Sequence, residues 1–136
     1  MRKIITALAI GTLALSGGAA LAKEKQTGEE KLAELLEGRV AGEPMRCIPT
    51  FRSNDNMTII DDTAIVYKSG RTIYVNRTAH PESLDWTDVL VIQRFTGTEL
   101  CKLDRVTTVD RGSGFFTGVV FLTDFVPYTL PEKDEG

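Results

Sequence analysis

The segment of residues 58–77, TIIDDTAIVYKSGRTIYVNR, most constrains the fold because it reads as two strands joined by a tight turn. β-branched and aromatic residues fill both runs, and the Ser69-Gly70 pair between them allows the positive backbone torsions that a two-residue loop needs. The segments that follow also read largely as strands. The sequence therefore predicts that this hairpin is the seed of a small antiparallel sheet.

A two-residue loop at Ser69-Gly70 would place Tyr67 opposite Thr72, and it also predicts which side chains share a face. Side chains alternate between the two faces of a strand with period two. The face assigned to the core carries Ala64, Val66, Ile73 and Val75. The other face, expected to be exposed, mixes rings with hydrogen-bonding groups: Thr63, Ile65, Tyr67, Thr72, Tyr74 and Asn76. A three-residue loop over residues 68–70 would slip the register and scatter the apolar set.

Residues 1–22 have the pattern of a secretory signal peptide. Arg2-Lys3 precedes an apolar run over residues 4–15, and a small-residue stretch ends in Ala20-Leu21-Ala22. The run is short of the roughly 20 apolar residues that span a membrane, although an uncleaved anchor is the alternative. Cleavage would remove two cations from a chain with 16 Lys+Arg and 19 Asp+Glu. We therefore expect an acidic exported protein, periplasmic or secreted, with no membrane span after cleavage and no affinity for nucleic acid.

A short helix is predicted between the signal and the β-rich part. Thr27 and Glu30 have the spacing of a capping box, and leucines at 32, 35 and 36 fall on one side of a 3.6-residue repeat. The helix spans about residues 29–37, with Gly38 as its C-terminal cap. It would cover one side of the sheet; docking a partner is the alternative. The expected organisation is helix and linker over 23–44, one β-rich domain over 45–130, and a mobile charged tail over 131–136.

Cys47 and Cys101 are the only two cysteines. In an exported chain two cysteines are most economically a disulfide. The rival interpretation is a reactive thiol pair, but redox motifs usually hold their cysteines within a few residues of one another. The wide spacing therefore favours a structural disulfide.

The loop of residues 78–88 contains the only histidine, His80, and the only tryptophan, Trp86. A small hydrolase or metal-dependent enzyme would have to use His80 with Asp85 and Asp88, or a triad of His80 with Ser83 or Ser53. Metal sites normally gather three or four ligands, so one histidine with scattered acids is a weak signal. We expect an ordinary surface loop, with no catalytic residue, metal or cofactor. Trp86 is expected to fill the core beneath the loop, with a sugar-stacking platform as the alternative.

Two later segments read as buried strands. The segment of residues 89–95 is apolar on both faces through Ile92, which is typical of a strand covered on each side. Residues 116–125 are predicted to form the most buried strand. Between them, Arg111-Gly-Ser-Gly114 has glycines like a phosphate loop but lacks the Lys-Ser/Thr ending and the following helix. A hairpin turn is the better interpretation of this motif.

Several short motifs resemble an uncharacterised family of small exported proteobacterial proteins with paired cysteines and a closing Phe-x-Pro segment. They are Arg46-Cys-Ile48, Ile60-Asp61-Asp62, Tyr74-Val-Asn76, Leu100-Cys101-x-x-Asp104 and Asp124-Phe-Val-Pro-Tyr128. Members tend to carry a further cysteine where this chain has Val120, so the departure indicates a single bridge here. The resemblance implies a periplasmic location and carries over no activity, substrate or catalytic residue.

Together these observations predict a mainly β protein. The expected fold is a small antiparallel sheet, curled or sandwich-like, of about five to seven strands with one short N-terminal helix. The expected function is a non-enzymatic module that binds an envelope protein or surface component through Tyr67, Thr72, Tyr74 and Asn76. A structural envelope protein without a ligand is the first alternative, and an enzyme around His80 is the second.

Overall fold

The computed structural model describes residues 25–50 and 56–132, so the predicted signal peptide and most of the predicted tail lie outside the described residues. The fold is mainly β, as expected, with one α-helix and ten strands in three antiparallel sheets within these ranges. In chain order the elements are α1 (Gly28–Leu35), β1 (Val40–Ala41), β2 (Cys47–Pro49), β3 (Met57–Ile60), β4 (Ala64–Ser69), β5 (Thr72–Asn76), the 3₁₀ turn η2 (Pro81–Ser83), β6 (Asp88–Gln93), β7 (Glu99–Cys101), β8 (Arg105–Asp110), β9 (Phe116–Val120) and β10 (Val126–Thr129). The strands outnumber the expected five to seven partly because β1, β2 and β7 are only two or three residues long.

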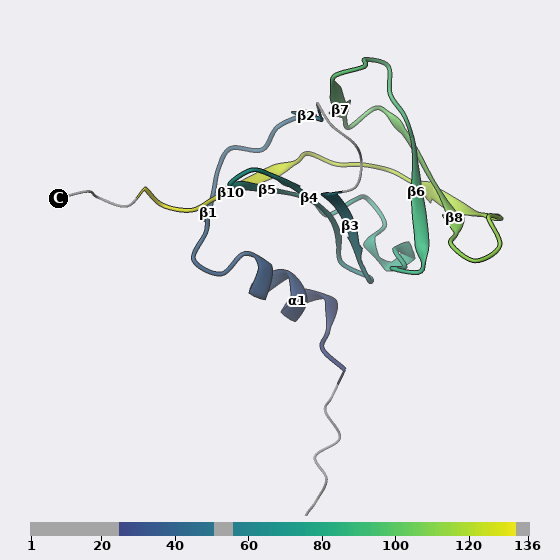
Figure 1. Ribbon diagram of the computed structural model, residues 1–136, viewed down its shortest axis with the longest axis horizontal. Coiled ribbons are helices and arrows are strands. Elements are labelled where there is room, and N and C mark those ends of the chain that lie inside the picture. The colour runs from purple at the N-terminus through teal and green to yellow at the C-terminus, as the bar shows by residue number, and fades with distance from the viewer. Residues whose placement is uncertain (1–24, 51–55, 133–136) are drawn as a thin grey trace, which may run out of the picture.

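A five-stranded sheet in the order β1-β10-β5-β4-β3 forms the middle layer. Helix α1 lies against one of its faces, and the three-stranded sheet β6-β8-β9 lies on the other side (Figure 1). The small pair β2-β7 lies beside this second sheet (Figure 1). The middle sheet is therefore covered on both faces.

The β4-β5 hairpin predicted from the sequence is present, but its loop is Gly70-Arg71 rather than Ser69-Gly70. Tyr67 lies opposite Tyr74 and Val66 lies opposite Val75, two residues away from the expected register. Gly70 has a positive φ of 58°, at the first central position of the turn, where glycine is favoured. Because faces alternate with period two, a shift of two residues leaves every side chain on its predicted face.

Both faces of this hairpin are buried, which corrects the expectation that one is exposed. The face predicted to be core packs under α1, with Ala64, Val66, Ile73 and Val75 around Leu32. The opposite face, with Ile65 and Tyr67, packs in a second cluster. Its other buried members are Ile48, Ile59, Leu84, Leu100, Val106, Val120, Leu122 and Phe125. The second sheet covers the hairpin face that carries Tyr67, and the hairpin sequence alone does not show this.

Helix α1 begins at the predicted capping box. The backbone N–H of Glu30 donates to the Thr27 hydroxyl at 3.2 Å, and the Thr27 backbone N–H donates to the Glu30 carboxylate at 2.9 Å. Gly38 follows the end of the helix with a φ of 74°. Leu32 is buried against the sheet and two further leucines are half-buried, so the covering role is confirmed.

Gly28 lets α1 approach the β3-β4 turn closely. A Cβ added there would overlap the Thr63 hydroxyl and the Asp61 backbone carbonyl. We expect Gly28→Ala to push the helix off the sheet, lower the free energy of unfolding by about 2 kcal/mol, and speed amide hydrogen exchange within α1. Gly97→Ala is the matched control, since nothing lies within 4 Å of its added Cβ. Unchanged exchange in α1 would contradict this account.

Two strands are less buried than their sequences predict. In β6, Val89 and Val91 are exposed while Leu90 and Ile92 pack inward, so this strand is covered on one face only. In the segment of residues 116–125, only Val120, Leu122 and Phe125 are buried, and β9 is an edge strand rather than the most buried one. Nothing in the described part of the chain covers the outer face of this three-stranded sheet.

Cys47 and Cys101 form the predicted disulfide. They are direct cross-strand partners in the β2-β7 pair, with their Cα atoms 4.0 Å apart. Their neighbours Ile48 and Leu100 are fully buried in the core beneath the second sheet. The bridge therefore fastens two short strands that have few ladder hydrogen bonds of their own.

Candidate functional site

The four residues expected to bind a partner lie together on one face of the hairpin. Tyr67 and Tyr74 stack, with ring centroids 6.2 Å apart and an interplanar angle of 24°. The exposure that the prediction assumed is not observed, because Tyr67 is 5% exposed, Asn76 is fully buried, and Tyr74 and Thr72 are half-buried. This face is the floor of the core beneath the second sheet.

Asn76 holds the incoming chain of β10 in place. Its amide nitrogen donates to the Thr123 carbonyl at 2.8 Å, and its amide oxygen accepts from the backbone N–H groups of Thr78 and Thr123 at 2.9 and 3.0 Å. The Thr123 hydroxyl also donates to it, at 3.2 Å. A fully buried amide with this set of partners explains why the position is polar without invoking a ligand.

Within the described residues, the His80 ring does not contact Ser83, Asp85 or Asp88, the partners considered for an enzyme site. The exposed His80 ring lies 3.3 Å from the Glu82 carboxylate and edge-on to Phe121. The Ser83 hydroxyl donates to the His80 backbone carbonyl at 2.8 Å rather than to the ring, and Ser53 lies outside the described residues.

The two aspartates named with His80 are engaged elsewhere. Asp85 accepts from the backbone N–H and the hydroxyl of Thr87, which hold the pKa of its carboxyl below the ordinary value. Asp88 is buried and accepts from the Thr117 hydroxyl at 3.0 Å. Within the described residues, the histidine and these acids therefore form no common site.

One cluster in the described ranges has metal-ligand residue types, namely Cys47, Glu99 and Cys101. Both sulfurs are in the disulfide. A disulfide sulfur is not the thiolate that binds metals, so this cluster reflects the bridge and not a metal site.

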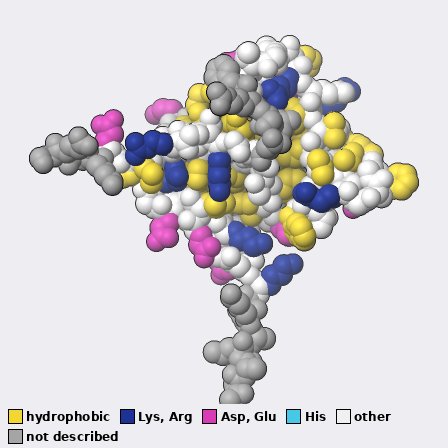
Figure 2. Space-filling model, in the orientation of Figure 1, with side chains coloured by type: hydrophobic (Ala, Val, Ile, Leu, Met, Phe, Trp, Pro, Cys, Tyr) yellow, Lys and Arg dark blue, Asp and Glu magenta, His cyan; other side chains and the backbone are white. Residues whose placement is uncertain are grey.

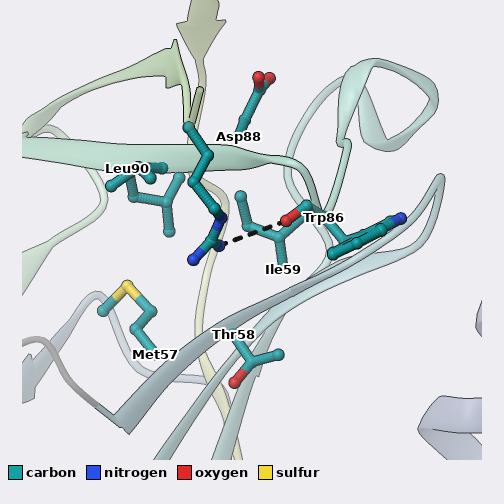
Figure 3. A pocket seen from close by; sticks show the side chains of 8 residues that line it. Met57, Thr58, Ile59, Trp86, Asp88 and Leu90 are labelled. Atoms are coloured by element: carbon teal, nitrogen blue, oxygen red, sulfur yellow. Dashed lines mark hydrogen bonds between the residues drawn. The ribbon is translucent and has the colours of Figure 1, made fainter. Parts of the chain in front are cut away.

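A cleft of about 450 Å³ lies between the facing edges of the middle and second sheets, and we call it the edge cleft (Figure 3). Met57 and Thr58 lie on one side, on β3, and Asp88 and Leu90 lie on the other, on β6 (Figure 3). The full lining is Met57, Thr58, Ile59, Trp86, Asp88, Val89, Leu90 and Arg111.

Trp86 lies at the mouth of the edge cleft and is 58% exposed, so the prediction that it fills the core is wrong. Its backbone is fixed from two directions. The Trp86 N–H donates to the Asp61 carboxylate at 2.6 Å, and Arg111 Nη2 donates to the Trp86 carbonyl at 3.4 Å, the dashed line in Figure 3. The Trp86 backbone is therefore held at both its N–H and its carbonyl while the indole lies in solvent.

Arg111 brings the only cation of the edge-cleft lining. It begins the β8-β9 turn, the hairpin turn predicted for Arg111-Gly-Ser-Gly114, and its backbone N–H donates to the Thr87 carbonyl at 3.1 Å. Asp110 before it accepts from the side-chain hydroxyl and the backbone N–H of Ser113, which lower the pKa of its carboxyl. The Asp110 carboxylate therefore stabilises its own turn.

The second candidate surface is the uncovered outer face of the sheet β6-β8-β9, which we call the outer apolar face. Figure 2 shows hydrophobic side chains gathered over the region of β6 and β8. Strand pairing places Val91, Thr107 and Val119 in one row across the three strands. The exposed large side chains of its strands are Val89, Val91, Phe116 and Val119, and the exposed Phe121 directly after β9 lies beside Thr107 and Val119.

Sequence reasoning missed both surfaces. Trp86 and Arg111 are 25 residues apart along the chain, and no local pattern connects them to each other or to β3. The apolar residues of β6 and β9 were visible, but alternation cannot say which face of a strand a second layer will cover.

The chain shows no significant match to models of known protein families, to curated proteins or to solved structures. Among residues 25–50 and 56–132, no helix is both long enough and apolar enough to cross a membrane. The site must therefore be interpreted from its own chemistry.

Proposed function

We propose that this chain is an exported, non-enzymatic binding module that docks a protein of the bacterial envelope through its outer apolar face. The observation that carries the proposal is the set of exposed apolar side chains on β6 and β9, which flank Thr107 of β8, together with Phe121 directly after β9; Phe116 is 65% and Phe121 is 59% exposed. Soluble monomers rarely leave such a patch uncovered, and large ones mark interaction sites. The sequence predicts the same class of function, a binding module, but on the hairpin face that carries Tyr67 and Tyr74.

A protein fits this face better than a lipid surface does. Membrane-surface binding usually combines apolar burial with basic residues that attract anionic lipid. The whole chain has a formal net charge of −3, and removal of residues 1–22 would make it more negative. Interface cores are likewise rich in phenylalanine, and the one charged residue that strand pairing puts on this face, Arg105, lies at the end of β8.

An exported location is part of the proposal. The predicted signal peptide and the resemblance to small exported proteobacterial proteins support it, and so does the Cys47–Cys101 disulfide, since such bonds persist in oxidising compartments such as the periplasm.

Site-specific photocrosslinking in the bacterial envelope tests the docking face. Benzoylphenylalanine placed at Phe116 or Phe121 is close in shape to the native ring and is expected to give one discrete adduct with a second protein. The same probe at Leu130, an exposed residue after β10, is the matched control and should give none. Val119→Asp should reduce the adduct at Phe121 at least tenfold, because it puts a charge in the centre of the face.

Three outcomes would contradict the proposal. Absence of an adduct at both phenylalanines would favour a structural protein without a ligand. An adduct of twice the chain mass would mean that a second copy covers the face, and adducts to lipid would mean that a membrane does.

A further inference from the structure

The edge cleft lies where two sheets end without a neighbouring strand. In the described ranges β3 pairs only with β4, and β6 pairs only with β8. An edge strand presents a row of backbone N–H and C=O groups that have no ladder partner. Two such edges face one another across the cleft (Figure 3). The cleft therefore offers backbone hydrogen bonding from its walls.

The side chains of the edge cleft add apolar contact. Ile59 is buried in its floor, and Met57 and Leu90 are half-buried on opposite walls. The exposed Trp86 indole lies at the mouth, on a backbone held by Asp61 and Arg111. A rigid apolar floor with an aromatic ring at its rim suits an apolar segment that keeps one end in water.

The edge-cleft lining has one cation, Arg111, and one carboxylate, Asp88, and only the cation is turned toward the cleft. Arg111 has five N–H donors, of which its contact with the Trp86 carbonyl uses one. The Asp88 carboxylate points away from Met57 and Thr58 in Figure 3 and accepts from Thr117. The guanidinium can therefore pair with an incoming carboxylate, for which its planar fork is well matched.

We propose that the edge cleft binds an extended peptide segment that ends in a free carboxylate. Backbone groups of the segment would pair with the edge of β3 or β6, apolar side chains would lie on the floor near Ile59, and the terminal carboxylate would pair with Arg111. Three residues of each strand line the cleft, which at about 3.4 Å per residue fits a segment of three to four residues. This is strand addition combined with carboxylate capture.

The single tryptophan makes the test direct, because Trp86 is the only indole in the chain and it lines the cleft. The probe is the peptide acetyl-Val-Thr-Ile-Val with a free C-terminal carboxylate, titrated against the whole exported chain while Trp86 emission is recorded. We expect a saturable emission shift. The C-terminal amide of the same peptide should bind about tenfold more weakly, since a charge-assisted hydrogen bond is lost.

Variants separate the two parts of the proposal. Arg111→Gln should weaken the free acid about tenfold and make acid and amide equal, whereas Arg105→Gln, an exposed arginine on β8 that does not line the edge cleft, should change neither affinity. A peptide N-methylated at alternate backbone nitrogens should bind at least tenfold more weakly in one of the two methylation registers, because alternate N–H groups face the pairing edge.

Distinct results would overturn the inference. Absence of an emission shift with the free acid would exclude the site for such peptides. If decanoate binds as tightly as the peptide and neither N-methylated peptide is weakened, the cleft takes an apolar carboxylate and not a strand. Val119→Asp, on the outer apolar face, should leave peptide affinity unchanged, so this test stands or fails separately from the proposed docking function.

Discussion

Replacing both cysteines, Cys47→Ser together with Cys101→Ser, is expected to lower the free energy of unfolding by about 4 kcal/mol. The bridge joins positions 54 residues apart, and without it the unfolded chain regains the entropy of that long open loop. Domains of this size are commonly stable by only about 5–15 kcal/mol, so the loss removes a large share of the total. The strands β2 and β7 should separate first, because each is three residues long.

Urea unfolding followed by circular dichroism measures this effect. The free energy of unfolding is compared between the oxidised protein and the double serine variant, with the same dependence on urea concentration used for both. The reduced, alkylated native chain is the control, and its free energy of unfolding should fall by a similar amount. A loss below about 1 kcal/mol would mean that the core residues Ile48 and Leu100 hold the strand pair without the bridge.

Asn76→Ala is expected to cost about 3 kcal/mol of folding stability, the second large effect. The substitution leaves the backbone N–H groups of Thr78 and Thr123 and the Thr123 carbonyl without the partner they have now. Buried donors that lose their acceptor keep the full cost of desolvation. The chain before β10 should loosen, which hydrogen exchange at residues 121–125 would record.

Thr72→Ala is the matched control for Asn76, since Thr72 is on the same face of the same strand and is only half-buried. We expect it to change stability by less than about 0.5 kcal/mol. If Asn76→Ala instead leaves stability unchanged, the side-chain hydrogen bonds of Asn76 do not hold the chain before β10 in place, and this account is wrong.

Patterns carried within one stretch of chain predicted the local elements well. Thr27 and Glu30 specify where α1 begins, because a capping box acts over three residues. The hairpin of β4 and β5 follows from its β-branched runs and Gly70, and its two faces follow from alternation although the loop lies one residue later than expected. The pairing of Cys47 with Cys101 needed no geometry, because no third cysteine competes.

The candidate sites could not be predicted in this way. The edge cleft joins β3, the loop at Trp86 and the turn at Arg111, and these segments meet only because two separate sheets end side by side. The exposed outer apolar face depends on the same arrangement: a second layer covers Tyr67 and leaves Phe116 uncovered. The local sequence predicts burial equally well for Tyr67 and for Phe116.

The sequence by itself determined that this chain is mainly β, where its helix begins, how its cysteines pair and which side chains share a face of the hairpin. These properties depend on the backbone torsions and on residues close to one another along the chain. Only the tertiary structure decided which faces are buried, where the edge cleft opens and which apolar residues remain in solvent. Burial is a property of how layers stack, and stacking depends on contacts between residues far apart in the sequence.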